Sequence, residues 1–195
     1  MNAKQTVNTN LPQGKSPPPV AADVPWHEQT FDVLREFDIR QIPYLPDGGL
    51  APLIEKCAKA DGMVATALTT EEEGVMLIAG AWLGGNRAAM LIQSSGVGNC
   101  VNAFSLLSVC TIPCVMVVTM RGVWGEFSPW QVPMGKAARG CFELFDFAVL
   151  DLERQDEATE VMRSACQLAY GAGRRVAVLV SQRMLGAKTF TKAKP

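Results

Sequence analysis

Three consecutive carboxylates, Glu71, Glu72 and Glu73, open an apolar segment that reads TTEEEGVMLIAGAWLGG. Acidic residues in the first turn of a helix interact favourably with its positive end, and a threonine directly before them can cap the helix. Capping explains one or two of the three acids. A carboxyl group shielded from water at a helix start could also hold and exchange a proton. This segment is therefore the first candidate for chemistry.

A second segment, IQSSGVGN, leads from an apolar run into a helical pattern. Gly96 and Gly98 would let the backbone approach a ligand closely and would expose amide groups at a helix start. The segment is not a P-loop, because no Lys-Ser or Lys-Thr pair follows, and it lacks the third glycine of a dinucleotide fingerprint. A plain strand-to-helix turn remains the alternative.

A third segment, RGVWGEFSPWQVPMG at residues 121–135, is expected to form a long loop. Arg121 directly follows an apolar strand pattern, which suits an anionic substrate, although pairing with a nearby acid is the alternative. Trp124, Phe127 and Trp130 must bury against a ligand, a partner chain or the domain's own surface.

Alternating strand and helix patterns would position these segments. Strand patterns fall at residues 39–45, 63–68, 88–93, 114–120, 147–152 and 174–182. Helical patterns fall between them and before them, at residues 27–38, 49–60, 71–85, 98–110, 140–145 and 156–173. This alternation predicts a single three-layer α/β domain, with a six-stranded parallel sheet covered by helices on both faces. In such sheets ligands bind beyond the carboxyl ends of the strands, where the three segments fall.

Composition limits the other classes of function. The chain has 195 residues, 48% of them hydrophobic, and a net charge of −1. These values predict one domain, residues 25–186, between an N-terminal arm (1–24) and a C-terminal tail (187–195). They favour neither a nucleic-acid nor a membrane partner. Because no apolar run reaches about 18 residues and no signal peptide is recognisable, a cytoplasmic protein is expected.

The six cysteines are expected to be reduced and mostly buried. Cys110 and Cys114 flank a short TIP segment, but His27 is the only histidine that could complete a metal site with them. We therefore expect this chain to hold no metal ion.

Five segments, in order, carry a resemblance to a known family: YLPDGGLAPLI, TEEEGVMLIAGAWLGG, LIQSSGVGNCVNAFSLL, IPCVMVVTMRG and QVPMG. They resemble the pyrimidine-binding (PYR) domain of thiamine diphosphate-dependent 2-oxo acid decarboxylases. The sulfopyruvate decarboxylase α subunits are the most similar group, and the phosphonopyruvate decarboxylases are related to them. The similarity extends from about residue 28 to residue 183.

The resemblance gives Glu71 a catalytic role. In this family a glutamate lies nine residues before a helix glycine, and counting back from Gly80 reaches Glu71. That glutamate hydrogen-bonds the pyrimidine ring of the cofactor and favours its imino tautomer. Glu72 and Glu73 are then the acids of the first helical turn.

Further site residues follow from the same resemblance. Five residues are expected to pack around the cofactor: Ser95, Gly96, Val97, Gly98 and Asn99. Four are expected on the substrate side: Asp47, Asn102, Arg121 and Gln131. The aromatic residues of the third segment depart from the pattern expected for a small sulfonated substrate, so a bulkier or aromatic 2-oxo acid stays an alternative.

The sequence contains no Gly-Asp-Gly stretch, which in this family binds Mg2+ and the cofactor's diphosphate. The resemblance therefore implies a separate β subunit that holds Mg2+, in an assembly of two α and two β chains or larger. The expected reaction converts 3-sulfopyruvate to sulfoacetaldehyde and CO2. The alternatives are another 2-oxo acid such as a phosphonate, carboligation in place of simple decarboxylation, and a non-catalytic scaffold subunit.

Overall fold

The computed structural model describes residues 24–186. The expected tail and all but the last residue of the expected arm lie outside this range, so the domain limits remain predictions.

Six parallel strands form one sheet, which confirms the predicted fold class. The strands are β1 (Ile39–Tyr44), β2 (Val64–Ala67), β3 (Arg87–Gln93), β4 (Cys114–Thr119), β5 (Ala148–Leu152) and β6 (Arg175–Val180). Their order across the sheet is β2-β1-β3-β4-β6-β5. In the centre, Gln93 pairs with Thr119 and Thr119 with Val180, so three strands end side by side at the same edge.

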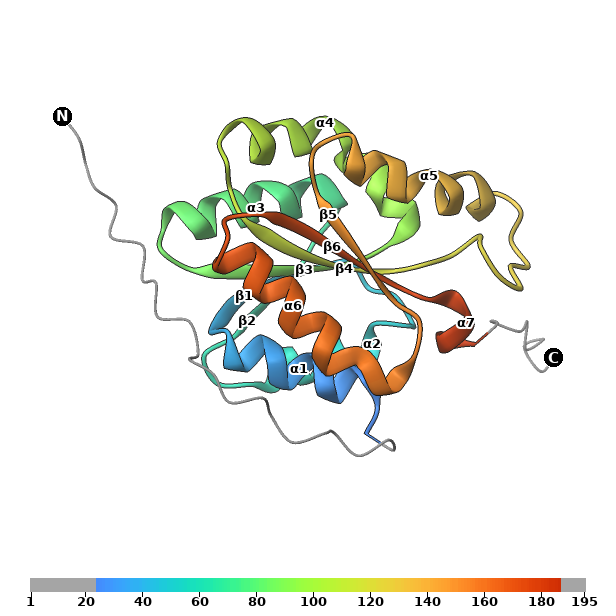
Figure 1. Ribbon diagram of the computed structural model, residues 1–195, viewed down its shortest axis with the longest axis horizontal. Helices are drawn as coiled ribbons and strands as arrows, with labels where there is room; N and C mark the ends of the chain where they lie inside the picture. Colours follow the sequence, from blue (N-terminus) through green and yellow to red (C-terminus); the bar gives the residue numbers. More distant parts are fainter. Residues whose placement is uncertain (1–23, 187–195) are drawn as a thin grey trace.

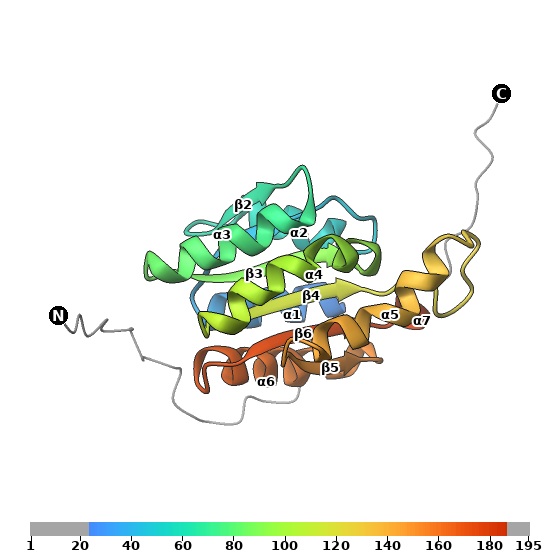
Figure 2. The same cartoon turned by 90° about the horizontal axis from the view of Figure 1, so that it is seen from above.

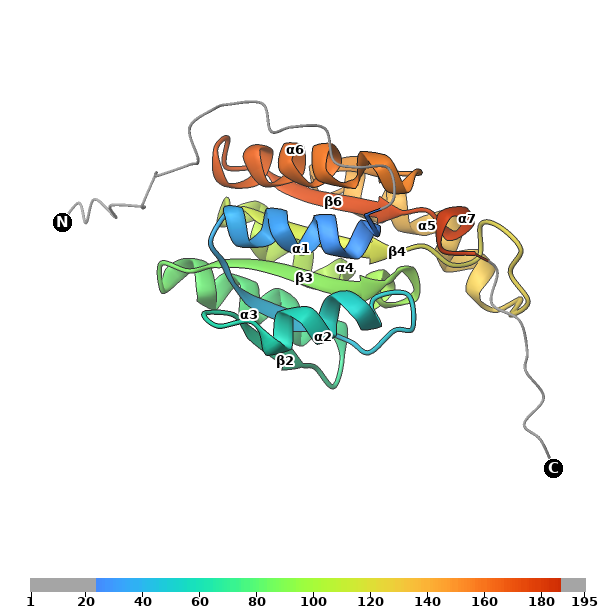
Figure 3. The same cartoon turned by 90° about the horizontal axis from the view of Figure 1, so that it is seen from below.

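Helices cover both faces of the sheet (Figure 1). On one face, seen in Figure 3, lie α1 (Trp26–Glu36), α2 (Ala51–Lys59) and α6 (Ala158–Tyr170). On the other face, seen in Figure 2, lie α3 (Glu71–Leu83), α4 (Ser94–Val109) and α5 (Gln131–Glu143). Two short helices, η1 (Gln155–Glu157) and α7 (Gln182–Leu185), complete the described elements. Each face has its own apolar core, and β4 and β6 are buried along their whole length.

Two predicted boundaries are wrong. The helix expected from residue 98 begins at Ser94, directly after β3, so SSGVGN is helical rather than a loop. The helix expected at residues 140–145 begins at Gln131 and ends at Glu143, so the long loop expected to reach residue 135 ends at Trp130. Glycine has low helix propensity, which disguised both starts, but packing against neighbouring elements overrides that preference. The helix α7 was not expected at all.

Candidate active site

The three acids at the start of α3 have different surroundings. Glu71 is 6% exposed, and its Oε2 accepts a hydrogen bond of 2.7 Å from Nδ2 of Asn99 on α4. The Glu73 carboxylate accepts a hydrogen bond of 2.8 Å from the backbone N–H of Thr69. Thr70 is the N-cap residue of α3, but its hydroxyl makes no capping hydrogen bond, and Glu73 is the acid that bonds a backbone amide at this helix start. Since Glu72 is exposed, Glu71 is the one acid of the three that is buried.

Gly96 on α4 faces the Glu71 carboxyl group. A Cβ atom on Gly96 would lie 2.1 Å from Oε1 of Glu71, so any side chain there would displace the carboxyl. One turn further along α4, Cys100 is buried, and burial followed by the charges of Glu71 and Glu72 raises the pKa of its thiol far above the ordinary value. The Glu71 carboxyl therefore lies among the Asn99 amide, the α4 backbone at Gly96 and the neutral Cys100 thiol.

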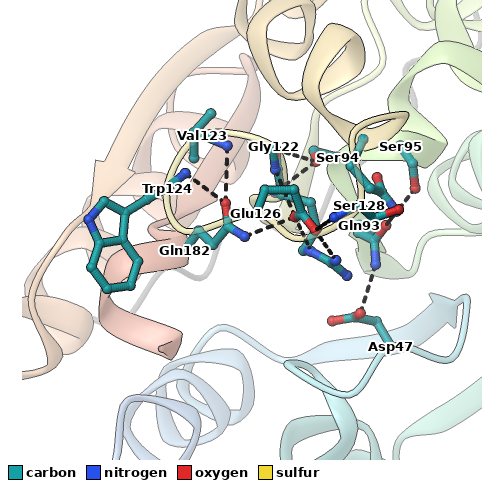
Figure 4. Close-up of polar contacts among 12 residues, drawn as sticks. Asp47, Gln93, Ser94, Ser95, Gly122, Val123, Trp124, Glu126, Ser128 and Gln182 are labelled. Carbon is teal, nitrogen blue, oxygen red and sulfur yellow. Dashed lines mark hydrogen bonds and ion pairs between the residues drawn. The ribbon is translucent and has the colours of Figure 1, made fainter. Parts of the chain in front are cut away.

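Asp47, in the loop after β1, is bound by the residues that end β3 and β4. Figure 4 shows its contact with Gln93. Its Oδ1 accepts a hydrogen bond of 2.9 Å from Nε2 of Gln93, the last residue of β3. Its Oδ2 accepts hydrogen bonds from the Thr119 hydroxyl at 3.0 Å and from the Gly49 backbone N–H at 2.8 Å. The loop acid is thus held in one position over the carboxyl edge of the sheet.

Gln93 connects Asp47 to two other predicted site residues. Its Oε1 accepts hydrogen bonds from the Ser95 hydroxyl at 2.7 Å and from Nε2 of Gln131 at 3.0 Å. Gln131 is 5% exposed, and its own Oε1 has no hydrogen-bond partner within the described part of the chain. The structure therefore brings Asp47, Ser95 and Gln131 into one network.

Arg121 is paired with a nearby acid, the alternative considered from the sequence. Its Nε and Nη2 donate to the two carboxylate oxygens of Glu126 at 2.7 and 2.6 Å, and the side chains are only 10% and 4% exposed. Glu126 also accepts from the backbone N–H groups of Gly122 and Ser128 and from Nε2 of Gln182. The hydrogen bond with Arg121 is the main reason that the pKa of Glu126 falls to about 2.

A cavity of about 260 Å³ lies beside these groups. Asp47, Thr119, Arg121, Gln182 and Leu185 contribute to its wall. Two predicted substrate residues, Asp47 and Arg121, therefore lie in the wall of one cavity, which carries a carboxylate and a guanidinium. Its volume is below the range of about 300–1,000 Å³ typical of sites for drug-sized ligands, so it suits a small molecule.

The aromatic residues of the loop between β4 and α5 do not contribute to the wall of this cavity. Trp124, Phe127 and Trp130 are exposed, and the Phe127 ring lies 5.5 Å from the Arg121 guanidinium carbon. Gln182 accepts the backbone N–H of Trp124 at 2.9 Å, and Figure 4 shows the indole on the far side of Gln182 from the cavity residues. They provide no reason to expect a bulky substrate, and they leave an apolar surface beside the cavity.

Other predicted residues on α4 have different positions. Val97 is fully buried in the core, so its side chain faces the sheet. Gly98 and Asn102 lie on the exposed side of the helix. Their predicted roles toward the cofactor and the substrate remain predictions.

Four residues of these networks were not predicted: Gln93, Thr119, Glu126 and Gln182. Gln93 and Thr119 are polar residues that end two buried strands, which is a signal that the sequence does carry. Glu126 lies five residues from Arg121, close enough to be recognised as its partner.

Within residues 24–186, no group of three or more His, Cys, Asp or Glu side chains is arranged to hold a metal ion. All six cysteines are unpaired. No helix in this range has the length and apolar character needed to cross a bilayer.

Similarity to a solved structure defines the class of fold. The chain aligns with a 2-oxoglutarate:ferredoxin oxidoreductase from Magnetococcus marinus, solved with 2-oxoglutarate, coenzyme A and succinyl-CoA bound. The TM-score is 0.64 at 12% sequence identity, and the alignment covers 83% of this chain but 29% of the oxidoreductase chain. At this identity the likeness shows the fold alone. No family model matches the sequence.

Curated relatives identify the family. The chain is 35% identical over 114 residues to the sulfopyruvate decarboxylase subunit alpha of Methanococcus maripaludis, a match covering 58% of this chain and 68% of the relative. It is 34% identical over 137 residues to the subunit of the same name from Methanothermobacter thermautotrophicus, with 70% and 83% covered. The chain belongs to the family of sulfopyruvate decarboxylase α subunits, as its motifs predicted.

A longer relative also matches. The sulfopyruvate decarboxylase of Methanosarcina acetivorans is 36% identical over 112 residues, which cover 55% of this chain but 28% of that protein. Most of the longer protein therefore has no counterpart in this match.

Proposed function

We propose that residues 25–186 form the pyrimidine-binding domain of a cytoplasmic, thiamine diphosphate-dependent decarboxylase. The proposed reaction converts 3-sulfopyruvate to sulfoacetaldehyde and CO2. The observation that carries the proposal is the buried Glu71 carboxyl, held by Asn99 over the bare backbone of Gly96, in a chain that belongs to this family.

The residues around Glu71 fit the pyrimidine half of the cofactor. Asn99 occupies Oε2, so Oε1 is the oxygen at which Glu71 would hold or release a proton toward a ring nitrogen. Gly96 leaves the space that the Glu71 carboxyl itself occupies, and Ser95 lies beside it at the start of α4. Bound thiamine diphosphate would supply the electron sink that lets a 2-oxo acid lose CO2. Burial of Glu71 would keep water from competing for its proton.

The cavity lined by Asp47 and Arg121 would take the substrate. Because Glu126 balances its charge, the Arg121 guanidinium in this wall would offer a hydrogen-bond donor to 3-sulfopyruvate rather than an unpaired positive charge. Asp47 lies in the same wall, where a carboxylate fixed by three donors could orient a reacting group or exchange a proton with it. The small volume supports a short 2-oxo acid over an aromatic one.

The surface of α3 and α4 supports a partner chain. After Glu73, neither helix contains a charged residue. Four large apolar side chains of these helices are exposed: Met76, Leu83, Leu106 and Val109. Gly80 also lies on this surface, and a Cβ atom at this position would contact nothing in the described part of the domain. The domain itself therefore does not require a glycine here, although glycine inside a helix costs about 1 kcal/mol relative to alanine.

Exposed apolar residues on helices without charged groups are typical of a protein interface. Met76 lies five residues after Glu71 on α3, so an interface that includes Met76 would lie near the proposed cofactor site. We propose that the partner is a β subunit, which holds Mg2+ and the diphosphate in an assembly of two α and two β chains or larger.

The test is reconstitution of the α chain with its β subunit and measurement of CO2 release from 3-sulfopyruvate, with and without thiamine diphosphate and Mg2+. The expected result is activity that requires both chains and the cofactor. Addition of an aldehyde, followed by product analysis, distinguishes decarboxylation from carboligation. Cofactor-dependent decarboxylation by the α chain alone would contradict the two-chain site.

Glu71→Gln tests the catalytic group, and Glu72→Gln is the matched control on the exposed side of the same helical turn. Removing a positioned acid–base group typically lowers the rate about 10²- to 10⁴-fold. We expect a loss in this range for Glu71→Gln and less than about a twofold change for Glu72→Gln, with the assembly intact in both. Equal losses in both variants would show that the assignment to Glu71 is wrong.

A further inference from the structure

Gln93 is the central residue of the network between Asp47, Ser95 and Gln131. It ends β3 and is also the N-cap residue of α4, with extended backbone angles of φ −94° and ψ 155°. Its amide therefore lies where the sheet passes directly into the helix, and it makes one contact as a donor and two as an acceptor.

The direction of each hydrogen bond follows from the acid. An ionised carboxylate only accepts, so the Asp47 side of the Gln93 amide must be its NH2 group. Oε1 of Gln93 must then face Ser95 and Gln131, and both must donate to it. The Gln131 amide therefore directs its NH2 group toward Gln93, and its Oε1 is buried without a hydrogen-bond partner in the described chain. One acid thus sets the orientation of three side chains.

This arrangement favours a functional explanation over a purely structural one. A buried amide oxygen without a partner is unfavourable, and such groups are concentrated where a ligand or an ordered water supplies the donor. Gln131 keeps this orientation because Gln93 holds its NH2 group at 3.0 Å.

We propose that Gln93 is a positioning residue, which acts through Asp47 by fixing its carboxylate and by coupling it to Ser95 and Gln131. The inference rests on the proposed function, because its effect is expressed in the decarboxylation of a 2-oxo acid. Thr119 holds the other oxygen of Asp47 from the end of β4, so the acid is fixed by the ends of β3 and β4.

A double-mutant cycle on the reconstituted complex tests the proposal, with Gln93→Met, Asp47→Asn and the double variant. Misplacement of a reacting group by about 1 Å can cost a factor near 10². We therefore expect Gln93→Met to lower kcat about 10- to 100-fold, with KM changed less than about threefold. In the Asp47→Asn background, Gln93→Met should have almost no further effect. The matched control is Gln41→Met on β1, a partly exposed strand glutamine outside the network, which should leave kcat unchanged.

Additive losses in the cycle would show that Gln93 does not act through Asp47 and would overturn the proposal. If the wild-type complex decarboxylates another 2-oxo acid but not 3-sulfopyruvate, the substrate assignment fails, and the same cycle is measured with that acid.

A second measurement does not need activity. In the ¹⁵N-labelled α chain, the side-chain NH2 resonances of Gln93 should shift when Asp47→Asn removes the charged acceptor. Unchanged resonances would show that the carboxylate does not orient this amide and would overturn the proposal independently of any rate.

Discussion

Replacing Glu126 by alanine removes a carboxylate that accepts two hydrogen bonds from Arg121 and one each from Gly122, Ser128 and Gln182. It also leaves the Arg121 charge without its partner in a place where that side chain is 10% exposed. Removing one member of a buried ion pair typically costs about 3–5 kcal/mol, because the remaining charge stays desolvated. In a domain of this size, 1 kcal/mol corresponds to about 2–4 °C in Tm, so the expected decrease is about 6–20 °C.

The assay is urea and thermal unfolding of the α chain at neutral pH, followed by circular dichroism. Glu36→Ala is the matched control, because Arg163 binds Glu36 with the same Nε and Nη2 groups, at 3.2 and 2.6 Å, on a more exposed surface. An exposed pair is worth about 0–1 kcal/mol. The contrast between the two variants therefore measures the combined effect of burial and of the three further hydrogen bonds that Glu126 accepts, for two similar ion pairs.

A second substitution tests the physical reason for the loss. Because the cost comes from an unpaired buried charge, Glu126→Ala combined with Arg121→Met should be more stable than Glu126→Ala alone. A loss from Glu126→Ala no larger than that from Glu36→Ala, or a double variant that is less stable than the single one, would refute the reasoning.

Three further predictions concern acid stability, the glycine at the site and the thiols. Because the pKa of Glu126 is about 2 in the folded chain against an ordinary value of 4.5, its stabilisation should be complete above pH 4.5 and lost as the pH falls toward 2. Urea midpoints against pH should show this slope in the wild type and a weaker one in Glu126→Gln; equal slopes would contradict it. Gly96→Ala should lower kcat as strongly as Glu71→Gln with an unchanged circular dichroism spectrum, because the new methyl group would displace the carboxyl; an active variant would exclude this contact. A thiol reagent should modify the exposed Cys110 rapidly in the folded chain. Burial raises the pKa of three other thiols to about 12: Cys57, Cys114 and Cys166. These three should react only after unfolding, and rapid reaction of any of them in the folded chain would contradict their burial.

The fold could be predicted because its signals are local. The segments CVMVVT and RVAVLV are apolar at every position except one, and both are buried strands at the centre of the sheet. Such runs predict parallel strands covered on both faces, independently of any detail of packing. The start of α4 could not be predicted in the same way, because Gly96 and Gly98 disfavour a helix and only contacts made by the folded chain stabilise one there.

The candidate site could be predicted in part for the same reason. The count from Gly80 identified Glu71, but its partner Asn99 is 28 residues away, and no periodicity connects them. Gln93 is 46 residues from Asp47, and only the order of the strands brings the two together. A network of this kind depends on strand neighbours, which a single sequence does not reveal.

The junction between β3 and α4 is the element that positions the site. The Ser94 hydroxyl accepts a hydrogen bond of 3.0 Å from the Arg121 backbone N–H, and the Ser95 hydroxyl donates to Gln93. The Glu71 carboxyl packs against Gly96. Three consecutive residues thus contact three different parts of the site, which is feasible because no loop separates the strand from the helix and successive helical residues point about 100° apart. The glycine and serine content of this segment therefore reflects close contacts at a helix start rather than the freedom of a loop. For this reason the site is rigidly tied to the centre of the sheet, where the carboxyl ends of β3, β4 and β6 lie in register.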